Sequence, residues 1–305
     1  MTTLIFSLIL LCAATPYIYG QQYTSPDSVS THHLETVVVR APREPDYKRG
    51  VIPAQQLSGQ ELKALSSFSI ADALRSFSGV QVKDFGGVGG LKTVNIRSMG
   101  THHVGIFYDG VELSNAQNGQ IDLGQYSLDN MEAILVFNGQ KGSYLQPAKD
   151  FGSSGTVYLQ TRKPTFTDGA QTNLRASLRT GSFDLFNPAI LIEHRLEPRV
   201  TMSFNAEWIK SSGKYKFRYQ KVLPITHEIA YDTTAVRHNG DINATRLEGN
   251  LHIGLPDGQM LFKLYNYNSE RGIPGAIVNN VWRRGERLWD NNSFVQTTYE
   301  QQLSD

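Results

Sequence analysis

The sequence lacks disulfide partners and long apolar segments. It has a single cysteine, Cys12, in 305 residues, so no disulfide can form within the chain. A membrane-spanning helix needs about 18 or more apolar residues in a row, and no stretch after residue 20 supplies them. Any part of the chain that crosses a membrane must therefore cross as β-strands, whose backbone groups pair with neighbouring strands.

The sequence also lacks an excess of charge of either sign. It has 29 basic and 28 acidic residues, a net charge of +1. Nucleic-acid-binding domains present a basic face or stripe, so this balance predicts no nucleic-acid partner.

Motifs for enzymatic chemistry are missing as well. The glycines at 86–90 lack the spacing of a nucleotide-binding loop, and a strand pattern follows them instead of a helix. His32-His33 and His102-His103 are adjacent pairs, and neighbouring residues of a strand point to opposite faces, which disfavours a shared metal. We predict no enzymatic activity, no bound metal and no cofactor.

Residues 1–20 have the pattern of a secretory signal peptide. The apolar run Leu4–Ala14 has the length of a leader's apolar core and is too short to span a bilayer. No Lys or Arg precedes this run, and Ile18 is bulky where a small residue is usual. A buried strand or helix is the alternative, but we predict export, with Cys12 removed in the leader.

Residues 21–45 are polar and aperiodic apart from one short apolar stretch, Leu34–Ala41. Three consecutive valines at 37–39 favour an extended backbone, and Pro42 and Pro45 limit its length. Two interpretations stay open. The stretch is either an edge strand of the next domain or a strand that pairs with another protein by β-augmentation.

Residues 46–165 read as a small α+β domain. Ser58 and Glu61 form a capping box before a helical pattern that restarts at Ser69 and runs to Phe77. Gly79 stands where a left-handed cap would end the helix. Thr93–Arg97 alternates polar and apolar residues and predicts a half-buried strand.

A hairpin and two loops complete this domain. Asp109-Gly110 lies between the strand patterns Val104–Tyr108 and Val111–Leu113, which is a strong hairpin signal. The loop at 86–91 is rich in glycine, and the loop at 114–122 is rich in side-chain amides. Loops carry binding residues when a rigid scaffold positions them, although a solvated loop is the equal alternative for 114–122.

Residues 166–305 read as antiparallel strands of a membrane β-barrel. From Val200 to Trp208, apolar residues alternate strictly with polar ones, as in a strand with one face toward lipid. Polar links at 221–243 and 269–290 suggest extracellular loops, and a soluble β-sandwich is the alternative. The predicted strands are Gln171–Arg179, Ala189–Leu196, Val200–Ile209, Thr245–Ile253, Gln259–Asn268 and Phe294–Gln302.

These motifs together resemble TonB-dependent outer-membrane receptors. Ile70–Val80 is similar to the helix that precedes a Pro-Gly-Val turn in the plug domain, with Ser78 in place of proline. The Asp109-Gly110 hairpin, Ser127–Phe137 and Gly152–Thr161 are similar to the strands that follow in that domain. The resemblance implies an α+β plug domain followed by an antiparallel transmembrane β-barrel in the outer membrane of a Gram-negative cell.

The resemblance also implies partners and contact residues. The partners are TonB with its inner-membrane energising complex, outer-membrane lipid and a small-molecule nutrient. The segment that contacts TonB would be Glu35, Thr36, Val37, Val38 and Val39. Ligand contacts are expected in the two loops, at Gly87, Val88, Gly89, Asn115, Gln117, Asn118 and Gln120.

The expected function is active uptake of cobalamin, a ferric siderophore or a similar scarce nutrient. Glu270–Ile277 resembles a loop of cobalamin-receptor-like members. The alternative is a non-transporting binding protein or an inactive receptor remnant. Plugged transporters use about 22 strands, and 166–305 supplies about six at about ten residues each. We therefore expect an N-terminal or truncated portion with an incomplete barrel.

Overall fold

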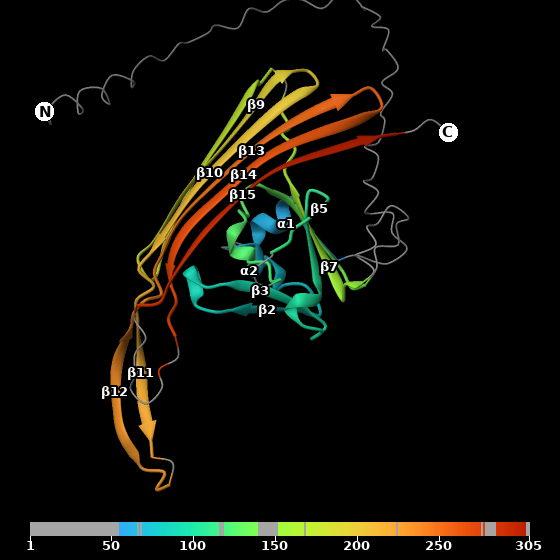
Figure 1. Cartoon of the computed structure of the whole chain (residues 1–305). Helices are drawn as coiled ribbons and strands as arrows, with labels where there is room; N and C mark the ends of the chain where they lie inside the picture. Colours follow the sequence, from blue (N-terminus) through green and yellow to red (C-terminus); the bar gives the residue numbers. More distant parts are fainter. Residues whose placement is uncertain are drawn as a thin grey trace, which may run out of the picture. The chain divides into compact units, whose positions relative to one another are not determined.

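The computed structural model describes residues 55–65, 67, 69–115, 119–139, 152–167, 169–223, 225–275, 277 and 285–302. The predicted leader (1–20) and the TonB-contact segment (35–39) lie outside the described residues. Two parts follow each other in the chain: an α+β domain, from Gln55 to Thr161, and a set of long antiparallel strands, from Thr172 to Gln301 (Figure 1).

The α+β domain contains short elements around a five-stranded sheet. The sheet order is β1-β6-β7-β4-β5, in which only β4 and β7 run parallel, and β2 pairs separately with β3. The elements are β1 (Gln55–Ser58), α1 (Gly59–Ala64), α2 (Ile70–Leu74), β2 (Val80–Asp84), η2 (Gly87–Gly89), β3 (Lys92–Ile96), η3 (Thr101–His103), β4 (Val104–Tyr108), β5 (Val111–Glu112), η4 (Leu123–Gln125), β6 (Met131–Phe137) and β7 (Gly155–Thr161).

Both predicted helix starts are confirmed, but the helices are shorter than the periodicity suggests. The Glu61 carboxylate accepts a hydrogen bond of 3.2 Å from the Ser58 amide, and the Ser69 hydroxyl accepts one of 3.2 Å from Asp72. Because Ser69 caps a new helix, the first helix ends before it. Gly79 has a φ of +75°, yet it lies in the turn before β2 and not at the end of α2.

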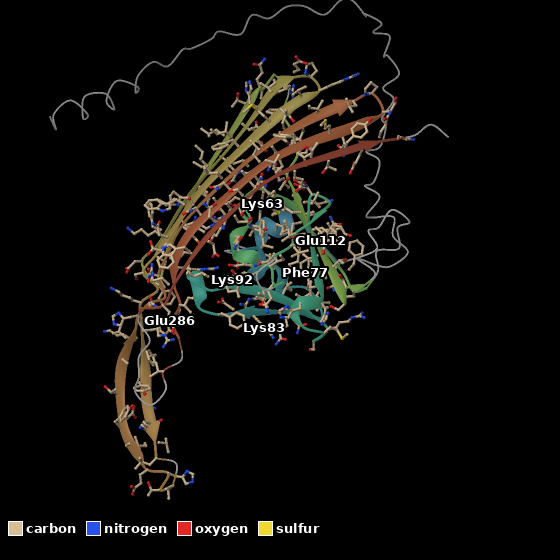
Figure 2. The ribbon with its side chains drawn as sticks, in the orientation of Figure 1. Lys63, Phe77, Lys83, Lys92, Glu112 and Glu286 are labelled. Atoms are coloured by element: carbon tan, nitrogen blue, oxygen red, sulfur yellow. The ribbon has the colours of Figure 1, made fainter. Side chains whose placement is uncertain are left out.

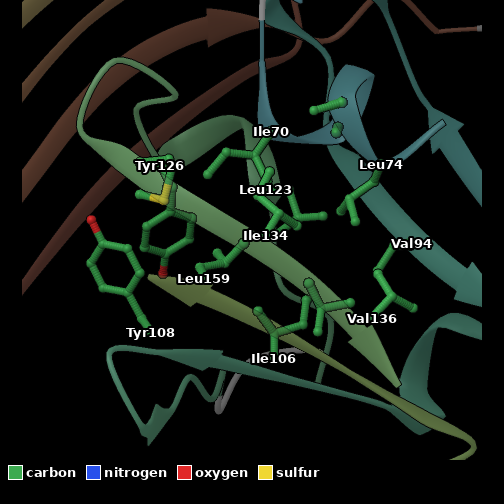
Figure 3. Close-up of a cluster of buried hydrophobic side chains, with 14 of the residues drawn as sticks. Ile70, Leu74, Val94, Ile106, Tyr108, Leu123, Tyr126, Ile134, Val136 and Leu159 are labelled. Carbon is green, nitrogen blue, oxygen red and sulfur yellow. The ribbon is translucent and has the colours of Figure 1, made fainter. Parts of the chain in front are cut away.

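The core of the α+β domain lies between helix α2 and the five-stranded sheet (Figure 3). Ile70 and Leu74 of α2 are fully buried, as are Ile134 and Leu159 of the sheet. Leu123 of η4 joins the same cluster. These residues therefore build the scaffold that carries the two candidate ligand loops.

Two predictions for this domain need correction. Strand β3 is buried on both faces instead of one, because the segment after it folds back, with the Gly100 amide 2.8 Å from the Asn95 carboxamide oxygen. His102 and His103 lie in the 3-10 turn η3 and not in a strand. The hairpin at Asp109-Gly110 is confirmed, with both residues at positive φ as a type I′ turn requires.

Six long strands form one antiparallel sheet, in the order β15-β14-β13-β10-β9-β8. The number agrees with the sequence prediction, but most strands are longer than predicted, because ladder pairing extends beyond the clearly alternating stretches. The strands are β8 (Thr172–Gly181), β9 (Leu185–Glu197), β10 (Val200–Ser211), β13 (Ile242–Leu255), β14 (Gly258–Gly272) and β15 (Arg287–Gln301).

The two faces of this sheet differ as the alternation predicts. In β10, Phe204 and Trp208 are about 40% exposed, whereas Asn205 and Glu207 between them are buried. The face that carries Phe204 also exposes Leu247, Leu264 and Val295 on neighbouring strands, and aromatic residues at one end: Phe186, Trp208 and Trp289. One face is therefore apolar with an aromatic border, which suits lipid.

The two ends of the sheet differ in their connections. At the short-turn end, residues 198–199 and 256–257 join neighbouring strands. At the long-link end, residues 212–241 and 273–286 join them. Of the described helices, none combines the length and the apolar character that crossing a membrane requires.

The link at 212–241 contains a second, two-stranded sheet, the β11–β12 arm (Tyr215–Val222 and Ile229–Arg237). Residues 221–243 were predicted as a polar link, but they include strand β12. Its residues pair across the arm, where the Tyr219 and Tyr231 rings lie 5.3 Å apart and Arg218 binds Asp232. Such cross-strand pairs stabilise a strand that its own composition signals only weakly.

Candidate functional site: the contact between the α+β domain and the long strands

The buried polar face of the six-stranded sheet binds the α+β domain through three basic side chains. Arg246 of β13 and Lys263 and Arg271 of β14 are each at most 4% exposed. All three point to the same face because they occupy alternate or paired positions in adjacent strands. Each makes contacts with a different segment of the α+β domain.

Lys263 lies in a cluster of four polar groups. Its ammonium pairs with Glu248 of β13 and lies 2.9 Å from Asp109 and 4.2 Å from the centre of the Tyr108 ring. Asp109 also accepts hydrogen bonds of 2.7 and 2.8 Å from the hydroxyl and amide of Thr161. The turn after β4 is thereby attached both to β7 and to the sheet.

Arg246 binds the turn η4. Its guanidinium pairs with Glu207 of β10 and donates hydrogen bonds to the backbone oxygens of Gly124 (2.8 Å) and Gln125 (2.5 Å). The Tyr265 hydroxyl donates to the same Gln125 oxygen at 2.5 Å. Two adjacent sheet strands therefore recognise the backbone of one turn.

Arg271 binds the region between the two candidate ligand loops. Its guanidinium lies 2.8 Å from Asp122, 2.7 Å from Asp290 of β15 and 3.3 Å from the backbone oxygen of Gly89. Breaking a buried ion pair by removing one partner is strongly destabilising, because it leaves a buried charge without compensation. Arg246, Lys263 and Arg271 thus join the sheet to three separate segments of the α+β domain.

The three residues predicted as ligand contacts in the first loop differ in their exposure. Gly87 is exposed and Val88 half-buried, whereas Gly89 is buried against the long-link end of the sheet. A Cβ at position 89 would lie 3.1 Å from that of Ile242. Gly89 thus packs against the sheet and Val88 packs partly against the core, whereas Gly87 is exposed.

The Asp84 side chain fixes the backbone of this loop by hydrogen bonds. It accepts hydrogen bonds from the amides of Gly86 (3.1 Å) and Gly87 (2.9 Å), and Lys92 donates to it at 2.7 Å. Burial opposes ionisation of Asp84, but Lys92 and the two amides outweigh it and lower the pKa of the carboxyl below its usual 3.8. The loop is therefore held by a charged side chain and is more ordered than its glycine content suggests.

The second predicted ligand loop is described only at its ends. The Asn115 carboxamide donates to the Gln120 backbone oxygen at 3.1 Å, and the Gln120 side chain lies 2.9 Å from the His102 ring. Gln117 and Asn118 lie outside the described residues. Asn115 and Gln120 are thus joined to each other within the loop, and Gln120 also contacts His102.

Several exposed residues near these loops were missed by the sequence analysis. Phe85 and Met99 are about 60% exposed, and Lys83 and Arg97 are exposed beside them in the chain. Figure 2 places Lys83 at the end of the α+β domain that is remote from Lys63 of α1. No local pattern marks these residues, because exposure at a hairpin end depends on what packs nearby.

The basic residues of the sheet could have been found from the sequence. They occupy polar positions of alternating strands, and a charged residue there must face a polar interior. In the described part of the chain, no group of His, Cys, Asp or Glu residues is arranged to hold a metal ion.

Comparisons with known proteins agree with this architecture. Residues 48–149 match the TonB-dependent Receptor Plug Domain. The structure is similar to the ferric citrate transporter FecA in its unliganded form, with a TM-score of 0.60 and 15% identity over 86% of this chain and 39% of that chain. It is also similar to P. aeruginosa FpvA bound to heterologous pyoverdines (TM-score 0.56, 13% identity, 83% and 32%).

A third similar structure is the ferric yersiniabactin uptake receptor FyuA from Yersinia pestis, with a TM-score of 0.53 and 12% identity over 83% of this chain and 39% of that chain. The chain spans 32–39% of the length of these neighbours. The matched domain and the neighbours are named as receptors and transporters, in agreement with the prediction of a protein that is not an enzyme. The α+β domain therefore matches the TonB-dependent receptor plug domain over residues 48–149, and together with the strands that follow it has the TonB-dependent receptor fold.

Proposed function

We propose that this chain acts in an outer-membrane receptor that takes up a scarce small-molecule nutrient with energy from TonB. One observation carries the proposal. A plug domain is bound to the polar face of an antiparallel sheet whose opposite face is apolar with an aromatic border. A sheet with one lipid-facing side and a domain on the other suits a plugged membrane pore.

The proposed division of labour follows the chain. Residues 1–20 direct export, 21–45 present the TonB-contact strand at Glu35–Val39, 46–165 form the plug, and 166–305 contribute to the barrel. At about 0.5–1.5 kcal/mol net per hydrogen bond, a strand of this length pairs with a stability of only a few kcal/mol. Such pairing is reversible, which suits a contact made and broken in each transport cycle.

An iron chelate is the ligand class that we favour. The similar structures named above carry the names of ferric citrate, pyoverdine and yersiniabactin proteins, and a further one is the copper transporter OprC. None of these supports cobalamin, which the sequence suggested through Glu270–Ile277. The first three residues of that stretch continue strand β14 and do not form a loop.

Uptake measurements test the proposal. A strain lacking the chain's own gene is complemented with the natural gene or with Val38→Pro, and labelled ferric siderophores, ferric citrate, copper and cobalamin are supplied. We expect one ligand to bind both strains, to accumulate only with the natural gene, and to stop accumulating when TonB is deleted. Proline removes a backbone donor and bends the strand.

Two results would contradict the proposal. Undiminished uptake by Val38→Pro would remove the assignment of residues 35–39. Binding without accumulation, equal in the presence and absence of TonB, would favour the alternative of a non-transporting binding protein.

A further inference from the structure

The buried pair Asp122 and Arg271 connects the two candidate ligand loops. Asp122 ends the second loop and is 5% exposed, and Arg271 of β14 is 4% exposed. One oxygen of Asp122 accepts hydrogen bonds from the amides of Lys92 (3.0 Å) and Gly124 (2.9 Å). The other accepts from Arg271 at 2.8 Å. The bonds from Lys92 and Arg271 are buried, so breaking either leaves a polar group without ready access to water.

Arg271 extends the connection to the first loop and to a neighbouring strand. The nitrogen that binds Asp122 is also 3.3 Å from the backbone oxygen of Gly89, and the second nitrogen donates to Asp290 of β15 at 2.7 Å. One guanidinium therefore contacts both loops and joins β14 to β15.

The first loop cannot shift without disturbing this pair or the contacts beside it. Beside the close approach of Gly89 to Ile242, a Cβ at Gly89 would lie 3.3 Å from the backbone oxygens of Gly240 and Asp241. Lys92, whose amide binds Asp122, also donates from its ammonium to the Gly87 oxygen at 2.7 Å. A shift of the loop thus disturbs Asp122, Arg271 or the start of β13.

Another ion pair between the plug and the sheet offers a comparison. Asp129 binds Arg179 of β8. It lies outside both loops, at residues 86–91 and 114–122, although it joins the same two parts of the molecule. Asp122 and Asp129 are both plug carboxylates that pair with an arginine of the sheet, but only Asp122 belongs to a candidate ligand loop.

We propose that Asp122 and Arg271 are positioning residues of the ligand site. They hold loop 86–91 and the described end of the second loop, 119–122, in one mutual arrangement, so the ligand meets these segments preorganised. A ligand that finds its contacts in place loses less conformational freedom on binding. The inference rests on the proposed function, since it assumes that these loops contact the ligand.

The test uses the full receptor in outer membranes and two readouts. Amide hydrogen exchange reports the order of each loop without any ligand, and binding of a labelled ferric siderophore or ferric citrate reports affinity. We expect Asp122→Asn to raise exchange in both 86–91 and 119–124 by about tenfold or more, and to raise Kd by a similar factor. The matched variant Asp129→Asn should leave both loops and Kd unchanged.

Two further variants separate positioning from a general loss of structure. Asp122→Glu keeps the charge but displaces it, so we expect a smaller effect in the same two loops. Combining Asp122→Asn with Arg271→Gln should weaken binding less than the sum of the single effects, because the two residues act through one contact. Exchange in the buried strand β6 should stay at the level of the natural protein.

The results that overturn the inference are distinct from failure of the proposed function. Faster exchange confined to 119–124, with 86–91 unchanged, would show that the pair does not join the loops. Loosening of both loops with an unchanged Kd would show that their arrangement does not matter for binding. A natural receptor that binds none of the tested compounds would contradict the proposed function, while the exchange comparison would still decide the link between the loops.

Discussion

The Tyr108 hydroxyl donates a hydrogen bond of 2.7 Å to the Glu248 carboxylate, although 140 residues separate them in the chain. Burial, and then the nearby carboxylates of Glu248 and Asp109, raise the pKa of Tyr108 well above its usual 10. The phenol therefore stays a neutral donor at physiological pH. Lys263 of β14 pairs with the same carboxylate. Glu248 therefore binds both the Tyr108 hydroxyl of the plug and the Lys263 ammonium of the sheet.

Replacing Lys263 with methionine should destabilise the attachment of the plug. The change leaves Asp109 and Glu248 buried without their cation, and breaking a buried pair in this way typically costs about 3–5 kcal/mol. Protease sensitivity of the plug and the thermal unfolding midpoint of the receptor measure the effect. Lys214→Met, at an exposed lysine, is the control. Adding Glu248→Gln should recover part of the loss, and no recovery would contradict the account.

Replacing Phe204 with lysine should impair insertion of the sheet into the membrane. Phe204 lies in the middle of the apolar face and is 40% exposed, and a charge at such a position costs about 2–4 kcal/mol in lipid. Leu223→Lys is the matched control, because Leu223 has a similar exposure of 38% but lies in the connection between β11 and β12, outside the six-stranded sheet. Fractionation and heat-modifiability of the membrane protein are measured. Equal loss in both variants would argue against a lipid-facing side.

The glycine loop should loosen only in strong acid. Asp84 has a lowered pKa, so its contribution to stability is complete above the unfolded value of about 3.9 and is lost as pH falls through the folded value. We expect protection of the Gly86 and Gly87 amides to stay constant from pH 7 to about pH 4.5 and to fall below pH 4. Asp84→Asn should remove this pH dependence. A fall already near pH 6 would implicate another group.

Charge reversal at Lys83 should weaken the binding of an anionic chelate. Lys83 is exposed and lies beside the glycine loop, so Lys83→Glu replaces an attraction with a repulsion, and at surface dielectric values this amounts to about three- to tenfold in Kd. Lys63→Glu, at the remote end of the plug (Figure 2), is the control. The same change in Kd for both variants would show that the effect comes from net charge alone.

Much of this fold could be predicted because the relevant signals are local. The Asp109-Gly110 turn requires positive φ at both residues, and few dipeptides tolerate that. The alternation from Val200 to Trp208 follows from a side-chain period of two. The cap residues Ser58 and Ser69 act within three residues of their partners, so their positions mark the helix starts directly.

The features that the sequence did not predict depend on contacts between residues that are far apart in the chain. Strand β12 depends on its partner β11, and β3 is covered on its second face by a segment that folds back from residue 100. The burial of Gly89 likewise depends on Ile242, which is distant in the sequence and occupies the space beside it. The residues next to β12, β3 and Gly89 in the sequence give no indication of these contacts.

By itself, the sequence determined the order of the parts, the plug-like domain before alternating strands, and the polar and apolar faces of those strands, because each depends on residues within about ten positions. Only the tertiary structure decided which polar residues meet. Arg271, Asp122 and Gly89 converge from three separate segments, and their shared burial makes each contact depend on the others. Side-chain periodicity indicates which face a charge occupies, whereas its partner is set by the packing of elements distant in the chain.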